Sequence, residues 1–101
     1  MKMNKLKGDL IMKEIDMTPY EEYFTELERL YFERNARMNI VAYILNHNYF
    51  TQEQYDKVYN DYLVSLKEYE KFISIFEQKV IIPICGPVQW TADFESRVVR
   101  V

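Results

Sequence analysis

Residues 20–45 read YEEYFTELERLYFERNARMNIVAYIL, and residues 55–80 read YDKVYNDYLVSLKEYEKFISIFEQKV. In each stretch, bulky residues recur at alternating steps of four and three, which is a 3.5-residue repeat. This spacing is typical of a helix that buries a narrow seam against another helix. The two seams are Tyr20, Phe24, Leu27, Tyr31, Arg34, Met38, Val41 and Leu45, and Tyr55, Tyr59, Tyr62, Leu66, Tyr69, Ile73, Phe76 and Val80.

Signals at the ends of these stretches predict an antiparallel hairpin. Thr18 with Glu21, and Thr51 with Gln54, match a capping box, in which each side chain bonds a free backbone N–H at the helix start. Asparagines flank His47 between the two stretches, and asparagine suits a helix end or a tight connection. Because a short connection makes neighbouring helices antiparallel, we predict one helix over residues 18–47 and a second over residues 51–80.

The flanking segments predict short extended arms within a single domain of residues 1–101. Residues 1–17 form an N-terminal arm. Within it, Leu10 to Met17 could be a short strand or a helical lead-in, because periodicity does not decide over eight residues, and we favour the strand. Pro83 is expected to stop the second helix by Ile82, because proline restricts the preceding residue and lacks an N–H donor. Residues 81–101 then form an extended C-terminal arm, in which the alternating segment 88–94 pairs with the β-branched segment 97–101 through a turn. The predicted fold class is mainly α.

Composition restricts the classes of partner. The net charge is −3, but residues 14–79 alone carry thirteen acids and seven bases. An acidic body argues against the basic face of a nucleic-acid-binding protein. No apolar run approaches the ~20 residues of a membrane span, and no signal peptide is evident. With Cys85 as the only cysteine, these features predict a cytoplasmic protein without a disulfide and without a membrane association.

No residue pattern indicates catalysis or a cofactor. His47 is the only histidine, and no nucleophile or carboxylate signature accompanies it. Cys85 lies among apolar residues, so we interpret it as a buried structural cysteine. A helical di-metal site would require a Glu-x-x-His pair, which is absent. We therefore expect a non-enzymatic protein with no catalytic residue, no metal and no cofactor.

The seams indicate that the hairpin is incomplete as a single copy. Tyrosine is common on them, and interfaces are enriched in tyrosine and arginine. Arg34 is the only charged residue on its seam, and a turn centred near Asn48 would place it opposite Tyr62, with Asp61 nearby. The stretch from Ile40 to Leu45 is apolar nearly all round, which predicts burial on more than one side. The candidate interaction residues are Tyr31, Arg34, Ile40, Tyr43, Ile44, Tyr62, Trp90 and Phe94.

We therefore expect an interaction or assembly module that forms a homo-oligomer, such as a dimeric four-helix bundle, or docks on a larger protein partner. An accessory subunit of a multiprotein or viral assembly would match this description. The C-terminal arm could add a strand to a neighbour's sheet. One alternative is an inhibitor, like an antitoxin or an anti-defence protein, that occupies a target's groove with acids such as Glu26 and Glu33. Another is a precursor peptide with a helical leader and a modifiable tail from Pro83 onward.

Overall fold

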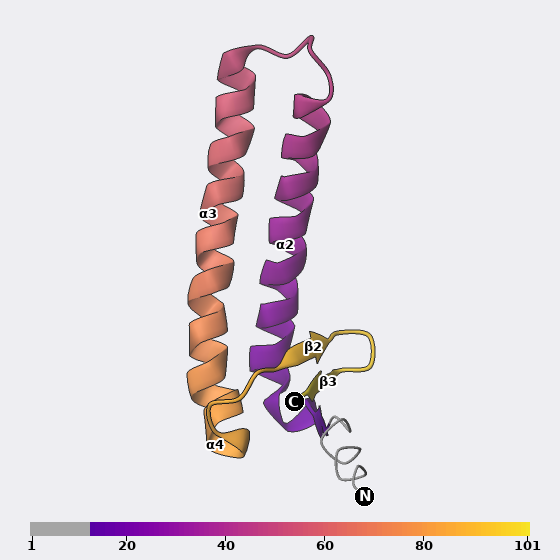
Figure 1. Ribbon diagram of the computed structural model, residues 1–101, viewed down its shortest axis with the longest axis vertical. Helices are drawn as coiled ribbons and strands as arrows, with labels where there is room; N and C mark the ends of the chain where they lie inside the picture. Colours follow the sequence, from indigo (N-terminus) through magenta and orange to yellow (C-terminus); the bar gives the residue numbers. More distant parts are fainter. Residues whose placement is uncertain (1–12) are drawn as a thin grey trace, which may run out of the picture.

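The computed structural model, described for residues 13–101, is a long antiparallel helical hairpin with a small sheet at its base (Figure 1). Helix α2 spans Glu21–Leu45 and helix α3 spans Gln52–Phe76. Each has 25 residues, and at 1.5 Å per residue each is about 37 Å long. The hairpin and its mainly helical class confirm what the two 3.5-residue seams predict.

The start of α3 forms the predicted capping box. Thr51 Oγ1 accepts a hydrogen bond from the Gln54 backbone N–H at 3.1 Å, and the Thr51 N–H donates to Gln54 Oε1 at 2.8 Å. The backbone N–H groups of Thr51 and Gln54, which have no carbonyl partner at the start of the helix, are thereby satisfied. This cap fixes the point at which the chain leaves the turn and enters α3.

Replacing Thr51 with alanine is expected to lower the free energy of unfolding by about 1 kcal/mol, because the cap on the Gln54 N–H is lost. Thr51→Ser keeps the hydroxyl and should stay close to the parent protein. Chemical denaturation followed by circular dichroism measures both variants. Equal stability of the alanine and serine variants would contradict a stabilising cap.

The predicted capping box at Thr18 is wrong. The Asp16 carboxylate accepts hydrogen bonds from the Thr18 N–H at 3.0 Å and from its hydroxyl at 2.8 Å, and these bonds hold the pKa of Asp16 below its ordinary value. Because the hydroxyl is used as a donor to the preceding residue, it does not cap a following N–H. Residues Thr18–Tyr20 form a single 3-10 turn, η1, and α2 begins after it at Glu21.

The second helix also continues beyond its predicted end. A π-helical segment, η2, spans Glu77–Ile81, and a short helix, α4, spans Ile82–Cys85. In a regular helix the Pro83 ring would crowd the carbonyl four residues earlier. The wider π turn, in which the Ile82 N–H donates to the Glu77 carbonyl, comes just before the proline. Pro83 then lies in the first turn of α4, where proline is tolerated. Gly86, with φ of 81°, ends the helix, so the extended arm begins there and not at residue 81.

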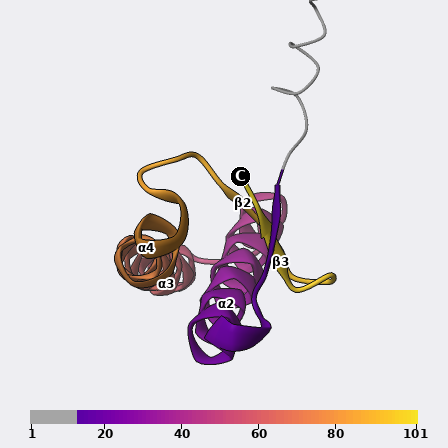
Figure 2. The same ribbon diagram turned by 90° about the horizontal axis from the view of Figure 1, so that it is seen from below.

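Both arms contribute to one antiparallel sheet at the base. Its strands are β1 (Glu14–Asp16), β2 (Thr91–Asp93) and β3 (Val98–Arg100), in the order β1-β3-β2. The Asp93 carboxylate accepts the N–H groups of Glu95 and Ser96, both at 3.1 Å, and so shapes the turn between β2 and β3. Short strands in both arms are confirmed; Leu10 to Met12, part of the predicted N-terminal strand, lie outside the described residues. Figure 2 shows the strands lying beside α2.

The buried core lies at the base of the hairpin, where the sheet covers the helices. The outer half, which we define as residues 38–64, contributes only Val41 to the buried apolar residues. Within residues 13–101, no helix is both long enough and apolar enough to cross a membrane. The base core comprises Met17, Phe24, Leu27, Phe76, Val80, Ile81 and Val99.

Candidate interaction surfaces

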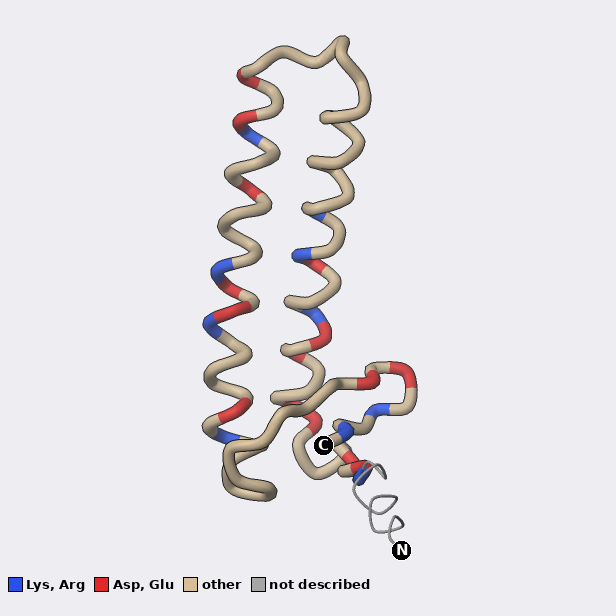
Figure 3. The backbone as a smooth tube through the Cα atoms, in the orientation of Figure 1, with Lys and Arg blue, Asp and Glu red and all other residues tan. Residues whose placement is uncertain are grey.

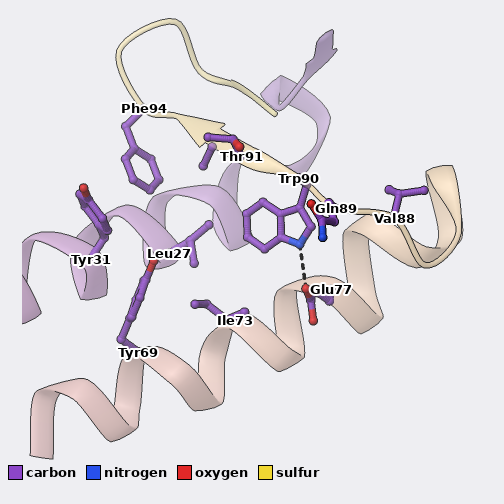
Figure 4. Close-up of a pocket in the computed structure, with 11 residues that line it drawn as sticks. Leu27, Tyr31, Tyr69, Ile73, Glu77, Val88, Gln89, Trp90, Thr91 and Phe94 are labelled. Carbon is purple, nitrogen blue, oxygen red and sulfur yellow. Dashed lines mark hydrogen bonds between the residues drawn. The ribbon is translucent and has the colours of Figure 1, made fainter. Parts of the chain in front are cut away.

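An aromatic groove of about 580 Å³ lies where the C-terminal arm crosses the two helices (Figure 4). Side chains of α2 and α3 form its floor, and the arm before and along β2 forms its wall. The only charged residue among those that line it is Glu77. The lining residues are Leu27, Tyr31, Tyr69, Ile73, Glu77, Val88, Gln89, Trp90, Thr91, Ala92 and Phe94.

Trp90 and Phe94, two of the candidate interaction residues, anchor the arm to its own chain. The Trp90 indole N–H donates to Glu77 Oε2 at 2.8 Å, and the indole ring centroid lies 5.2 Å from that of Phe76. The Phe94 ring lies 5.2 Å from both Phe24 and Tyr31. These contacts bury large rings and satisfy the indole N–H. The C-terminal arm is therefore folded on its own hairpin.

The Arg34 side chain stacks on Tyr69 and Tyr31, and not on Tyr62 as predicted. Its guanidinium carbon lies 5.0 Å from the Tyr69 ring centroid and 5.5 Å from that of Tyr31. Helical side chains lean toward the N-terminus of their own helix, which in an antiparallel pair means toward later residues of the partner helix. Asp61 pairs instead with Arg37 at 3.9 Å and Lys57 at 3.5 Å.

Arg34 also lacks a hydrogen-bond acceptor for a buried atom. Its Nε is buried without a partner among the described residues. Within residues 13–101 it forms no ion pair, whereas the other four arginines each contact at least one carboxylate. Stacking on two tyrosines stabilises the cation, but it leaves the in-plane donors of the guanidinium available. Burial raises the pKa of Tyr69 above its ordinary value, and the Arg34 charge opposes that rise.

Tyr62 belongs to a row of tyrosines along α3. The rings of Tyr55 and Tyr59 stack at 5.6 Å with 13° between their planes, and Tyr59 lies 6.2 Å from Tyr62. Steps of four and three continue this row through Leu66 to Tyr69, which lines the groove. The row thus extends from the groove at the base to the turn.

The other candidates, Ile40, Tyr43 and Ile44, lie on one face of the last turns of α2. Tyr43 is 51% exposed, and it stacks on His47 at 4.0 Å. Residues 38–52 contain no Asp, Glu, Lys or Arg, and Figure 3 shows this uncharged stretch at the end of α2 and in the turn. The large apolar side chains exposed in the outer half are Met38, Ile40, Tyr43, Leu45, Tyr49, Tyr59, Leu63 and Val64.

The candidates therefore fall into two groups. Tyr31, Trp90 and Phe94 line the groove, and Arg34 stacks on Tyr31 and Tyr69 beside it. The remaining four lie in the outer half. Sequence reasoning placed Tyr69 on a seam but did not select it as a site residue. It missed Glu77, which accepts the Trp90 indole N–H. The two residues are thirteen positions apart, and no sequence signal near Glu77 indicates this contact. Cys85 was predicted to be buried, but it is half-buried beside a second cavity of about 720 Å³.

Comparisons with protein-family models, with curated proteins and with solved structures found no match for this chain.

Proposed function

We propose that this chain is a non-enzymatic assembly module that self-associates through the outer half of its hairpin. The observation that carries the proposal is the uncharged, apolar end of the molecule, where Leu45 is 66% exposed and Tyr49 is 69% exposed. Exposed apolar surface that is not covered within a chain favours association, because contact removes it from water. A two-helix hairpin that pairs with a second copy completes a four-helix bundle.

A second copy suits this surface better than a charged target. In a two-fold symmetric contact the same patch faces itself, so the uncharged residues 38–52 would meet their copy without repulsion. The inhibitor hypothesis depends on acids such as Glu26 and Glu33, but Glu26 pairs with Arg29 at 2.6 Å and Glu33 with Arg37 at 3.1 Å. These carboxylates are engaged within α2, which makes them less available to a partner.

Exposed aromatic rings make up part of this surface. Tyr43, Tyr49 and Tyr59 are 51%, 69% and 38% exposed. A contact that covers such rings removes large, mostly apolar side chains from water.

Sedimentation equilibrium from low to high micromolar concentration tests the proposal on the unmodified chain. We expect a particle of twice the 12.3 kDa chain mass, or a larger whole multiple. A monomer at high micromolar concentration would contradict self-association.

A further inference from the structure

The strand β2 has an unpaired outer edge within the described residues. The sheet order β1-β3-β2 places β3 in the middle and β2 at one side. Lys13 and Val101 exchange both backbone hydrogen bonds, at 3.2 and 3.0 Å, and the Met17 N–H donates to the Arg97 carbonyl. The backbone N–H and C=O groups of alternate β3 residues therefore point toward β1, and those of Val98 and Arg100 point toward β2.

The same alternation fixes which groups of β2 face outward. Thr91 pairs with Arg100 and Asp93 pairs with Val98, so their backbone groups point toward β3. The N–H and C=O of Ala92 consequently point to the outer edge. The Ala92 side chain lies on the same face as Val99, which is buried in the base core. A residue added opposite Ala92 would direct its side chain toward the helices.

Arg34 lies where an added strand would cross α2. In Figure 1, β2 is the strand nearest the turn, so its outer edge faces the uncovered part of the hairpin. The arm crosses α2 with Phe94 packed on Tyr31. Arg34 is three residues farther along α2, a rise of about 4.5 Å, and neighbouring strands are ~4.8 Å apart. β2 and the following residue, Phe94, cross α2 at Tyr31. A strand added next to β2 would therefore cross α2 at Arg34.

We infer that the β2 edge binds an extended segment of a partner protein, in which an acidic side chain pairs with Arg34. Ala92 supplies the backbone hydrogen bonds, and an apolar side chain two positions from the acid packs on Tyr31 and Tyr69. Two positions is the spacing of side chains on one face of a strand. This inference goes beyond self-association and does not rest on it.

The chemistry of the site favours a carboxylate-bearing peptide. The planar guanidinium can donate two parallel hydrogen bonds to a carboxylate from its two terminal nitrogens, which are not among the buried atoms, whereas Nε is buried. A phosphopeptide would bring a second negative charge to a body that already carries thirteen acids against seven bases in residues 14–79. The chain's own arm already lays an extended, aromatic-bearing segment across the helices next to this position. A strand edge also offers backbone hydrogen bonds, which is the usual basis of strand addition.

Selection from a displayed library of random heptapeptides, with the folded full-length chain as bait, tests the inference. We expect selected peptides to carry Asp or Glu two positions from a bulky apolar residue. Arg34→Gln should weaken their binding about tenfold or more, because a charge-assisted pair is lost. Arg37→Gln is the matched control, since Arg37 lies one turn farther along α2 and already pairs with Glu33; binding should stay within about twofold.

Two measurements on the parent protein keep the test independent of how the variant folds. Changing the selected peptide's acid to its amide should reproduce the loss seen with Arg34→Gln. In NMR spectra of the complex, the Ala92 amide should gain protection from hydrogen exchange. The inference is overturned if no acidic peptide is enriched over an Arg34→Gln bait, if the amide peptide binds equally well, or if Ala92 is unaffected.

Discussion

Phe76→Ala is expected to lower the free energy of unfolding by about 3–5 kcal/mol, a large part of the ~5–15 kcal/mol typical of a domain. The Phe76 side chain is 0% exposed, and its ring lies 5.2 Å from Trp90 and 6.4 Å from Phe24. It joins α3 to both α2 and the C-terminal arm, so its loss removes contacts to two other segments. A cavity in the base core has no second core to compensate for it, because the outer half buries little.

Phe32→Ala is the matched control for that measurement. Phe32 has the same side chain on the same hairpin but is 53% exposed, with its ring 5.3 Å from Tyr31 and 6.0 Å from Phe94. Its truncation should therefore cost about 1–2 kcal/mol, well below the cost at Phe76. Denaturation of both variants and the parent at one fixed protein concentration separates core loss from any effect of association. Equal costs for the two truncations would contradict a core confined to the base.

The sequence was sufficient for the hairpin because its signals are local and repeated. A 3.5-residue seam depends only on spacing within one helix, and the Thr51 capping box involves residues three apart. The strands of the C-terminal arm were also predictable, since alternation and the turn residues near Asp93 are local features. Leu10 to Met17 were too short for periodicity to separate a strand from a helical lead-in. By contrast, Thr18 could act as a donor or as an acceptor. Which role it takes depends on Asp16, two residues earlier.

The site was only partly predictable, because its contacts join distant segments. The seams identified Tyr31 as an aromatic member and Arg34 as the only charged member of one seam, and the aromatic residues of the C-terminal arm drew attention to Trp90 and Phe94. The sequence does not reveal that Trp90 bonds Glu77 or that Arg34 stacks on Tyr69, since both contacts depend on how the arm and the helices pack. A symmetric register about the turn placed Arg34 opposite Tyr62. That register was centred near Asn48, whereas the contacts of Phe24 with Phe76 and of Tyr31 with Tyr69 centre the pairing near Phe50. The lean of helical side chains shifts the Arg34 contact further toward Tyr69.

Tyr43→Glu is expected to dissociate the proposed self-assembly. Tyr43 is 51% exposed on the face that also holds Ile40 and Ile44, so a carboxylate there would be desolvated in the contact. Hot-spot changes cost at least ~2 kcal/mol, and a two-fold contact contains the change twice, so we expect the dissociation constant to rise at least 10² to 10³-fold. Sedimentation velocity over a concentration series measures the shift.

Tyr23→Glu makes the same chemical change on the same helix, but at the base. Tyr23 is 36% exposed, and the new carboxylate would lie in the first turn of α2, where the helix dipole tolerates negative charge. If the outer half forms the contact, Tyr23→Glu should associate like the parent protein while Tyr43→Glu becomes monomeric with unchanged helical content by circular dichroism. Dissociation of both variants would instead indicate that added negative charge weakens association by general repulsion between the acidic chains, wherever it is placed. Dissociation by Tyr23→Glu alone would move the interface to the base of the hairpin.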